Sequence, residues 1–227
     1  MDETSLARDR MVEEQIARRG VQAPAVLAAM RTVPRESFVP EELRRHAHED
    51  RPLPIAAGQT ISQPFVVALM AEALALRPTD RVLEVGAGSG YAAAVLSRLA
   101  AQVHAVERYA ELAASAAGRL RELGYDNVEL HIGDGTTGWP AAAPFDAILV
   151  SAGGPAVPPA LTDQLAPDGR LVIPVGETPG DQRLLRVTRN GPATLSQEDL
   201  GAVRFVPLIG AQGWTEDGRR AAEWLRP

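Results

Sequence analysis

The sequence contains no cysteine, and this absence excludes several kinds of chemistry. Without thiols the chain forms no disulfide, has no catalytic thiolate and holds no zinc–thiolate centre. A basic excess is also missing, because 23 Lys and Arg residues stand against 29 Asp and Glu residues, for a net charge of −6. We therefore expect no general binding to nucleic acid or to anionic membranes, both of which require a basic surface.

Long apolar runs are missing as well. The most apolar window, residues 65–76, is interrupted by Glu72 and is too short to span a bilayer. The first residues, M-D-E-T-S, are polar and show no signal-peptide core. We expect a soluble, cytoplasmic protein, and 227 residues suffice for one large α/β domain with a buried core.

The stretch V-L-E-V-G-A-G-S-G-Y at residues 82–91 organises the chain. Its first residues predict a strand buried on both faces, and a helix is predicted over 92–100. The glycines at 86, 88 and 90 allow a sharp turn and a close approach of a ligand to the backbone. A dinucleotide fingerprint would need a further glycine where Tyr91 stands, so an NAD-dependent oxidoreductase is only a distant alternative.

The pattern acid-x-G-x-G-x-G, which begins at Glu84, resembles the first motif of Rossmann-like S-adenosylmethionine-dependent methyltransferases. A dinucleotide brings a pyrophosphate to the helix N-terminus, and an acidic residue there would repel it. S-adenosylmethionine instead carries an ammonium and a sulfonium, which suit a carboxylate. The position of Glu84 therefore favours S-adenosylmethionine.

The chain from residue 79 onward alternates between strand and helix patterns, which predicts a doubly wound parallel α/β sheet with ligands at the carboxyl ends of its strands. A pair of later strands with no helix between them predicts an antiparallel edge. The predicted strands cover 81–85, 103–106, 128–132, 145–151, 170–175, 184–189 and 203–208, and the remaining predicted helices cover 110–123 and 161–165.

Residues 1–78 are predicted to be a helical addition within a single methyltransferase domain spanning 1–227, whose cofactor-binding core is 79–227. Helices are expected over 6–19, 25–31 and 65–76, an extended segment over 35–40 and one or two helical turns over 41–48. The proline- and glycine-punctuated stretch 53–64, L-P-I-A-A-G-Q-T-I-S-Q-P, is expected to be a loop.

Acidic residues end three predicted strands in succession: Glu84, Glu107 and Asp134. Each alone could be a helix cap or a solvated turn. Together they predict an adenosine-binding crevice, with Glu107 on the ribose hydroxyls and Asp134 beside the adenine. The four histidines show no metal-ligand spacing and are interpreted as surface or packing residues; they are His46, His48, His104 and His131.

Hydroxyl and amide side chains gather in the loop at Gln59, Thr60, Ser62 and Gln63. Spacing alone favours Ser62 as the N-cap of the following helix, with Pro64 in its first turn. On this interpretation the loop would have no chemical role.

Motifs along most of the chain resemble the protein-L-isoaspartate (D-aspartate) O-methyltransferase family. G-Q-T-I-S-Q-P at 58–64 is the most specific, because it distinguishes this family from methyltransferases in general. The other matches are Met11-Val12, Gln15-Ile16, Arg19-Gly20, V-P-R-E-S-F-V-P at 33–40, R-P-L-P-I at 51–55, the glycine motif at 82–91, Val106-Glu107-Arg108, G-D-G at 133–135, P-F-D-A-I at 144–148 and V-I-P-V-G at 172–176.

The resemblance implies methyl transfer from S-adenosylmethionine to the free α-carboxylate of L-isoaspartyl residues of damaged proteins, with repair through a succinimide. The family name adds D-aspartyl residues as a second expected substrate. It makes Ser62 the active-site hydroxyl, which reverses its interpretation as a cap. The implied cofactor-binding residues are Gln59, Thr60, Ile61, Glu84, Gly86, Ala87, Gly88, Ser89, Gly90, Glu107, Arg108, Asp134 and Gly135, and the implied substrate-binding residues are Thr60, Ser62, Val206 and Leu208. No metal is implied. The sequence departs from the family pattern at Ala56-Ala57, at Ala92 and at Ala152-Gly153-Gly154.

The expected reaction needs few catalytic side chains, because a carboxylate nucleophile is already ionised near neutral pH. This agrees with the lack of a Ser-His-Asp or paired-carboxylate pattern. Ser62 is expected to orient the carboxylate rather than to attack. Two alternatives stay open: methylation of a dedicated peptide or small-molecule carboxylate, and a nucleotide-binding module without catalysis. A monomer is favoured.

Overall fold

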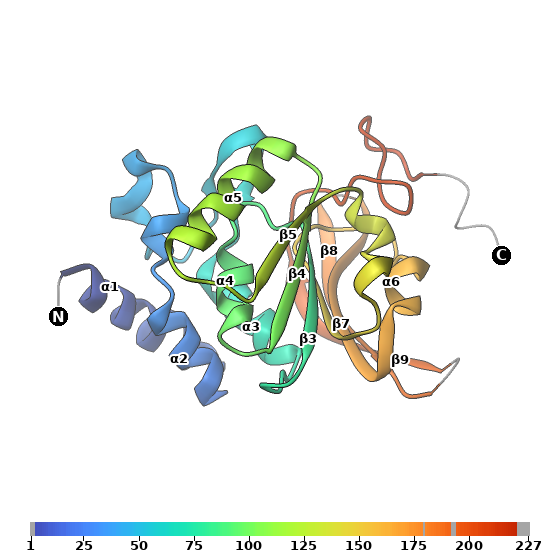
Figure 1. Ribbon diagram of the computed structural model, residues 1–227, viewed down its shortest axis with the longest axis horizontal. Coiled ribbons are helices and arrows are strands. Elements are labelled where there is room, and N and C mark those ends of the chain that lie inside the picture. Colours follow the sequence, from blue (N-terminus) through green and yellow to red (C-terminus); the bar gives the residue numbers. More distant parts are fainter. Residues whose placement is uncertain (1–2, 179, 192–193, 222–227) are drawn as a thin grey trace.

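A computed structural model describes residues 3–178, 180–191 and 194–221. Its centre is a seven-stranded sheet in the order β5-β4-β3-β6-β7-β8-β9 (Figure 1). The first five strands in that order run parallel, and β8 and β9 add an antiparallel edge, which confirms the predicted fold. The strands are β3 (Arg81–Val85), β4 (Gln102–Glu107), β5 (Val128–Ile132), β6 (Phe145–Val150), β7 (Leu165–Thr178), β8 (Asp181–Arg189) and β9 (Leu195–Val203).

Helices cover both faces of the sheet, and successive residues of β3 point into different cores. Val82 packs with the N-terminal helices and α4, whereas Leu83 packs with α6 on the other face. This is the arrangement that a buried parallel sheet requires. The helices are α1 (Glu3–Arg10), α2 (Pro24–Thr32), α3 (Pro64–Ala73), α4 (Tyr91–Ser97), α5 (Ala110–Glu122) and α6 (Pro159–Asp163). Among the described residues, none of the helices is long and apolar enough to cross a membrane.

The N-terminal addition shares its core with the sheet. Helix α1 continues through a π-helical segment, Met11–Ile16, and a 3-10 turn, Ala17–Arg19, and ends at Gly20 with φ 107°, as predicted. The extended segment predicted over 35–40 is wrong, because Arg35–Phe38 forms a 3-10 turn. In this turn the Ser37 N–H donates to the Pro34 carbonyl at 2.9 Å, and both Arg35 and Phe38 become fully buried.

The loop expected over 53–64 contains a small hairpin, which periodicity cannot reveal because each strand has only two residues. Strand β1 (Leu53–Pro54) pairs with β2 (Thr60–Ile61) in antiparallel register. A 3-10 turn, Ala56–Gly58, connects them, and the Ile55 N–H donates to the Gln59 carbonyl at 2.9 Å. The hairpin therefore fixes the loop directly before α3.

The last predicted strand, over 203–208, is also wrong. The final strand of the sheet is β9, whose sequence L-S-Q-E-D-L-G-A-V is polar and largely exposed at an edge, so it carries no alternating apolar signal. Residues 204–209 instead cross the carboxyl ends of the parallel strands. There the Gly153 N–H donates to the Val206 carbonyl, and the Leu208 N–H donates to the Gly153 carbonyl, both at 2.8 Å.

Candidate cofactor and substrate site

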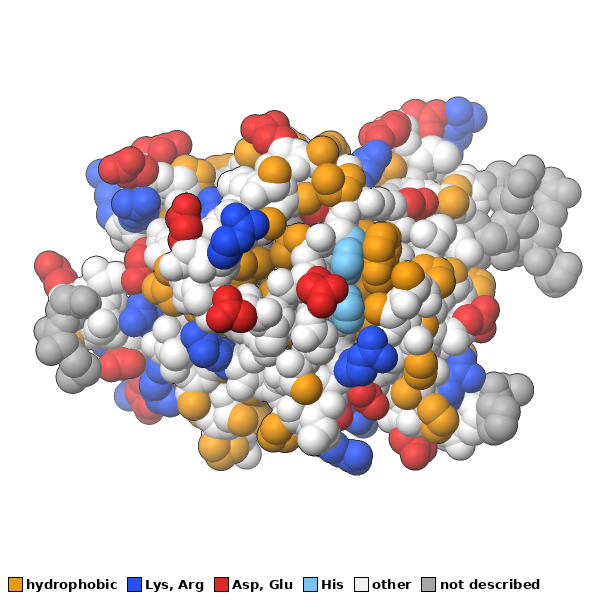
Figure 2. Space-filling model, viewed as in Figure 1, with side chains coloured by type: hydrophobic (Ala, Val, Ile, Leu, Met, Phe, Trp, Pro, Cys, Tyr) orange, Lys and Arg blue, Asp and Glu red, His pale blue; other side chains and the backbone are white. Residues whose placement is uncertain are grey.

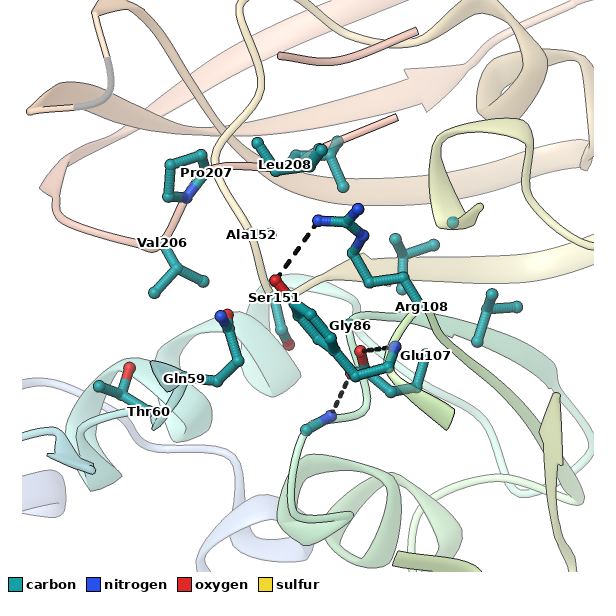
Figure 3. A pocket seen from close by; sticks show the side chains of 16 residues that line it. Gln59, Thr60, Gly86, Glu107, Arg108, Ser151, Ala152, Val206, Pro207 and Leu208 are labelled. Atoms are coloured by element: carbon teal, nitrogen blue, oxygen red, sulfur yellow. Dashed lines mark hydrogen bonds between the residues drawn. The ribbon is translucent and has the colours of Figure 1, made fainter. Parts of the chain in front are cut away.

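A crevice opens at the carboxyl ends of β3, β4 and β6, where Gly86, Glu107 and Ser151 meet (Figure 3). We call the residues on the β3 and β4 side, 84–90 and 107–109, the cofactor wall. Facing them are hairpin residues 53–62 and the crossing segment 204–209, which together we call the substrate wall. Figure 3 shows Val206, Pro207 and Leu208 across the crevice from Gly86 and Glu107.

The glycine loop turns through the left-handed region at Gly86, Gly88 and Gly90, with φ of 85°, 54° and 88°. Gly86 and Gly88 line the crevice. Gly90 does not; a Cβ placed there would lie 3.2 Å from Leu120 Cδ1 on α5. Gly90 thus lets α4 pack closely against α5, and its predicted contact with the cofactor stays a prediction.

Glu107 is buried at the end of β4 and ties the cofactor wall together. One carboxylate oxygen accepts the Gly88 N–H and the other accepts the Tyr109 N–H, both at 2.9 Å. Each oxygen keeps a further lone pair, so the carboxylate can still accept hydroxyl groups. Arg108 lies beside it, donates to the Tyr109 hydroxyl at 3.4 Å and forms an ion pair with Glu216.

Glu84 is 1% exposed, and neither of its carboxylate oxygens has a hydrogen-bond partner among the described residues. Burial raises its pKa well above the ordinary value, and the charge of Glu107 raises it further. The nearby Ala93 N–H, which does not complete a hydrogen bond, offsets only part of this rise in pKa. An unpartnered buried carboxyl is costly in a folded protein. It suits a ligand that brings a cation, as the ammonium of S-adenosylmethionine does.

Asp134 does not line the crevice, although its neighbour Gly135 does. One carboxylate oxygen accepts the N–H and the hydroxyl of Thr136, at 2.9 and 2.6 Å, and the other accepts the Ala211 N–H at 2.7 Å. The side chain therefore caps a 3-10 turn and fastens the C-terminal segment. Its contact with adenine stays a prediction.

Ser62 does not cap α3. The N-cap is Gln63, without a side-chain cap bond, and the Phe65 N–H is instead accepted by Asp50 at 3.1 Å. The Ser62 hydroxyl makes no hydrogen bond among the described residues. It borders two adjoining hollows, one beside Glu84 and the glycine loop and one forming an open groove along the substrate wall.

Arg35 fixes the backbone of Ser62 through a hydrogen bond. It is fully buried, and its Nη2 donates to the Ser62 carbonyl at 2.8 Å while its Nε donates to the Ala47 carbonyl at 2.8 Å. Its guanidinium carbon lies 4.8 Å from the centre of the Tyr91 ring. Desolvation lowers the pKa of Arg35 without removing its charge near neutral pH. The backbone that presents Ser62 is thus fixed by the turn that the sequence prediction missed.

The open groove is bordered by Arg19 and Phe65 on one side and by Arg204 and Phe205 on the other. Gln182 positions the second side, since its side chain accepts the Phe205 N–H at 2.7 Å and donates to the Phe205 carbonyl at 3.2 Å. Gly153 makes room for Gln182, because a Cβ at Gly153 would lie 2.2 Å from Gln182 Nε2. Position 153, where the sequence departs from the family pattern, thus has room only for glycine while Gln182 keeps this place.

All predicted site residues except Gly90 and Asp134 border the crevice or its two adjoining hollows. The prediction missed Tyr109 and Ser151. Ser151 and Thr60 border all three hollows, and so they lie at the junction of the site. A search for polar residues at strand ends singled out the acids. The same search would have found Ser151, because Ser151 directly follows the last residue of β6.

A doubly wound sheet with a glycine loop, an unpartnered buried acid and an acid at the next strand end defines an S-adenosylmethionine-dependent methyltransferase. A family model described as "Protein-L-isoaspartate(D-aspartate) O-methyltransferase (PCMT)" matches residues 6–213. The chain belongs to this family. It is a transferase that uses S-adenosylmethionine and methylates protein isoaspartyl residues, the first step of their repair.

Relatives agree along nearly the whole chain. A protein-L-isoaspartate O-methyltransferase of Rhodopseudomonas palustris is 61% identical over 94% of this chain and 99% of its own length. A protein-L-isoaspartate O-methyltransferase of Methylorubrum extorquens is 62% identical over 91% of this chain and 90% of its own length. Among solved structures, a putative enzyme of this name from Plasmodium falciparum, in complex with S-adenosyl-L-homocysteine, has a TM-score of 0.76 at 26% identity over 89% of this chain and 98% of that chain. Another protein-L-isoaspartate O-methyltransferase has a TM-score of 0.77 at 29% identity, covering 88% of this chain and 65% of that longer chain.

Proposed function

We propose that Ser62 positions the free α-carboxylate of an isoaspartyl residue, which reaches the site along the groove between hairpin 53–62 and residues 200–206. The Ser62 hydroxyl carries the proposal: it has no hydrogen-bond partner in the part of the chain that the structure describes, and it lies at the border between this groove and the hollow beside Glu84. A hydroxyl at that border can donate to a carboxylate oxygen on one side while the cofactor lies on the other.

The cofactor wall supplies the complementary contacts. Glu84 would pair with the ammonium of S-adenosylmethionine, and Glu107 would accept the ribose hydroxyls while holding Gly88. When bound, S-adenosylmethionine supplies the methyl group. The chain itself needs no general base, because the acceptor carboxylate is already ionised. Alignment of the acceptor and exclusion of water by residues 204–209 supply the acceleration.

Paired peptides test the substrate assignment. Two peptides of identical composition, one with an isoaspartyl and one with an aspartyl linkage, are incubated with enzyme and labelled S-adenosylmethionine. We expect the isoaspartyl peptide alone to be methylated, because the additional backbone methylene changes where the free carboxylate lies. Equal rates on both peptides would contradict the proposal, and exclusive labelling of small carboxylates would favour a dedicated biosynthetic enzyme.

Other properties expected from the sequence stay predictions. They are activity on D-aspartyl residues, a cytoplasmic location, a monomeric state, the absence of nucleic-acid and membrane partners, and a single domain over 1–227.

A further inference from the structure

Histidine side chains lie near the middle of the face drawn in Figure 2, beside an acidic side chain and an apolar patch. In the sheet, His104 of β4 is opposite Glu129 of β5, and His131 follows two residues after Glu129. Residues two apart on a strand point to the same face. Parallel pairing therefore brings His104 together with Glu129 and His131, although His104 and His131 are 27 positions apart in the sequence.

The donor atoms of these side chains are close together. His104 Nδ1 and His131 Nε2 are hydrogen-bonded to each other at 3.2 Å, a contact that a bound ion would replace, and His104 Nδ1 lies 3.5 Å from Glu129 Oε2. One donor atom from each residue lies within 4.8 Å of the others. A tetrahedral zinc ion with bonds of about 2.0–2.2 Å separates its ligand atoms by about 3.3–3.6 Å. The two measured distances are close to that requirement.

Neighbouring groups hold the rings in place. The His131 ring stacks on Trp139 with centroids 4.1 Å apart, and the His104 ring meets Phe145 edge-on at 5.8 Å. Gln102 Nε2 donates to Glu129 Oε1 at 3.0 Å, which leaves Oε2 toward His104. Outer contacts of this kind orient the ligands of metal sites.

The cluster has one buried and one open side. His104 is 6% exposed, whereas the Glu129 side chain is 57% exposed and can turn toward the two rings. Burial lowers the pKa of both His104 and His131. Arg81 is a nearby cation, and its charge would oppose part of the binding.

We propose that His104, Glu129 and His131 bind one divalent transition-metal ion of the zinc class, which clips edge strand β5 to β4. Two imidazoles and a carboxylate are a donor set suited to such ions. None of the three residues borders the cofactor crevice, so the ion acts on stability and not on methyl transfer. The proposal replaces the expectation that these histidines only pack or face solvent.

Calorimetry with zinc chloride on the metal-stripped full chain tests the site. We expect one ion per chain, a higher melting temperature with zinc, and a loss of affinity of about tenfold or more in His131→Ala. His46→Ala is the matched control, since His46 also contacts a carboxylate, Glu49 at 2.6 Å, and should leave zinc binding unchanged. If His131→Ala does not fold, the exposed Glu129→Ala takes its place.

Fluorescence gives a second readout. Because Trp139 stacks on His131, nickel or copper ions should quench its emission in saturable fashion, and Trp139→Phe should remove that quenching while zinc still binds. A chelator should lower the melting temperature of the zinc-loaded protein and leave the methylation rate unchanged. No saturable zinc binding, or equal binding in wild type and His131→Ala, would overturn the proposal.

Discussion

The two walls of the crevice are held by different kinds of contact. In the cofactor wall the fixing contacts join the ends of two neighbouring parallel strands: the Glu107 carboxylate, at the end of β4, accepts from Gly88, which follows β3, and from Tyr109. In the substrate wall they join segments outside the parallel strands, as with Arg35 behind Ser62 and Gln182 beside Phe205. The difference teaches that the methyl-donor side is built by the repeated strand–loop unit of the parallel sheet, whereas the acceptor side depends on segments added to that sheet.

If the two walls act separately, a change in the substrate wall should lower turnover and leave the affinity for the cofactor unchanged. Ser62→Ala should lower kcat/KM for an isoaspartyl peptide by about 10–1000-fold, as expected for the loss of one preorganised donor. Initial rates with labelled cofactor measure it. The matched control is Ser115→Ala on α5, which should leave the rate unchanged; the Ser115 hydroxyl accepts a hydrogen bond from Arg119 at 3.3 Å.

A change in the cofactor wall should instead weaken the binding of S-adenosylmethionine. Glu84→Gln should weaken S-adenosylmethionine binding by about 1.5–3 kcal/mol, the range for hydrogen bonds to a charged group. In the wild type the affinity should rise with pH through the raised pKa of Glu84, and this pH dependence should vanish in the variant. Calorimetry between pH 5 and 9 would detect it, and a parallel pH dependence in both proteins would exclude Glu84 as the ammonium partner.

The same variant should be more stable without cofactor. Because the folded pKa of Glu84 lies above the ordinary value of 4.5, the folded state binds more protons, and the free energy of unfolding falls as pH rises from 4.5 through the folded pKa. Glu84→Gln removes the buried charge. At pH values above this range, the free energy of unfolding of the variant should therefore exceed that of the wild type by about 1–3 kcal/mol. Thermal unfolding of the two proteins at pH 8 measures this difference.

Glu107→Ala should weaken cofactor binding by a similar amount, about 1.5–3 kcal/mol, since the variant loses the hydrogen bond to Gly88 together with the proposed ribose contact. Calorimetry with S-adenosylmethionine measures the change. Unchanged affinity would remove Glu107 from the site.

Gly153→Ala should damage the substrate wall through packing. The new Cβ would meet Gln182 at 2.2 Å and displace the residue that fixes Phe205, at a cost of about 1–3 kcal/mol in stability. We expect a higher KM for peptide with an unchanged cofactor affinity. Gly118→Ala on α5 is the control, because a Cβ there meets nothing within 4 Å, and it should stabilise the helix slightly.

Ala57→Gly should have the smallest effect. Ala57 adopts φ 56°, where a Cβ costs about 1 kcal/mol and glycine costs less. The variant should unfold at the same or a slightly higher temperature with full activity, whereas Ala56→Gly should destabilise by about 0.4–1 kcal/mol. A clear loss of stability in Ala57→Gly would mean that the strain is absent.

The sheet and the cofactor wall could be predicted because their signals are local. Strand β3 alternates between two buried faces, and glycines at fixed spacing follow Glu84. The substrate wall could not be predicted in this way. The 3-10 turn at Arg35, the two-residue hairpin strands and the path of 204–209 depend on contacts between distant segments, and only the family resemblance singled out Ser62. The meeting of His104 with His131 likewise required the strand register.

Binding of S-adenosylhomocysteine to Ser62→Ala, measured by calorimetry on the sample used for kinetics, tests the separation of the two walls most directly. We predict a dissociation constant within about twofold of wild type, together with the loss in kcat/KM. Weakening of about tenfold or more, which is about 1.4 kcal/mol, would show that Ser62 serves the cofactor and would contradict the account.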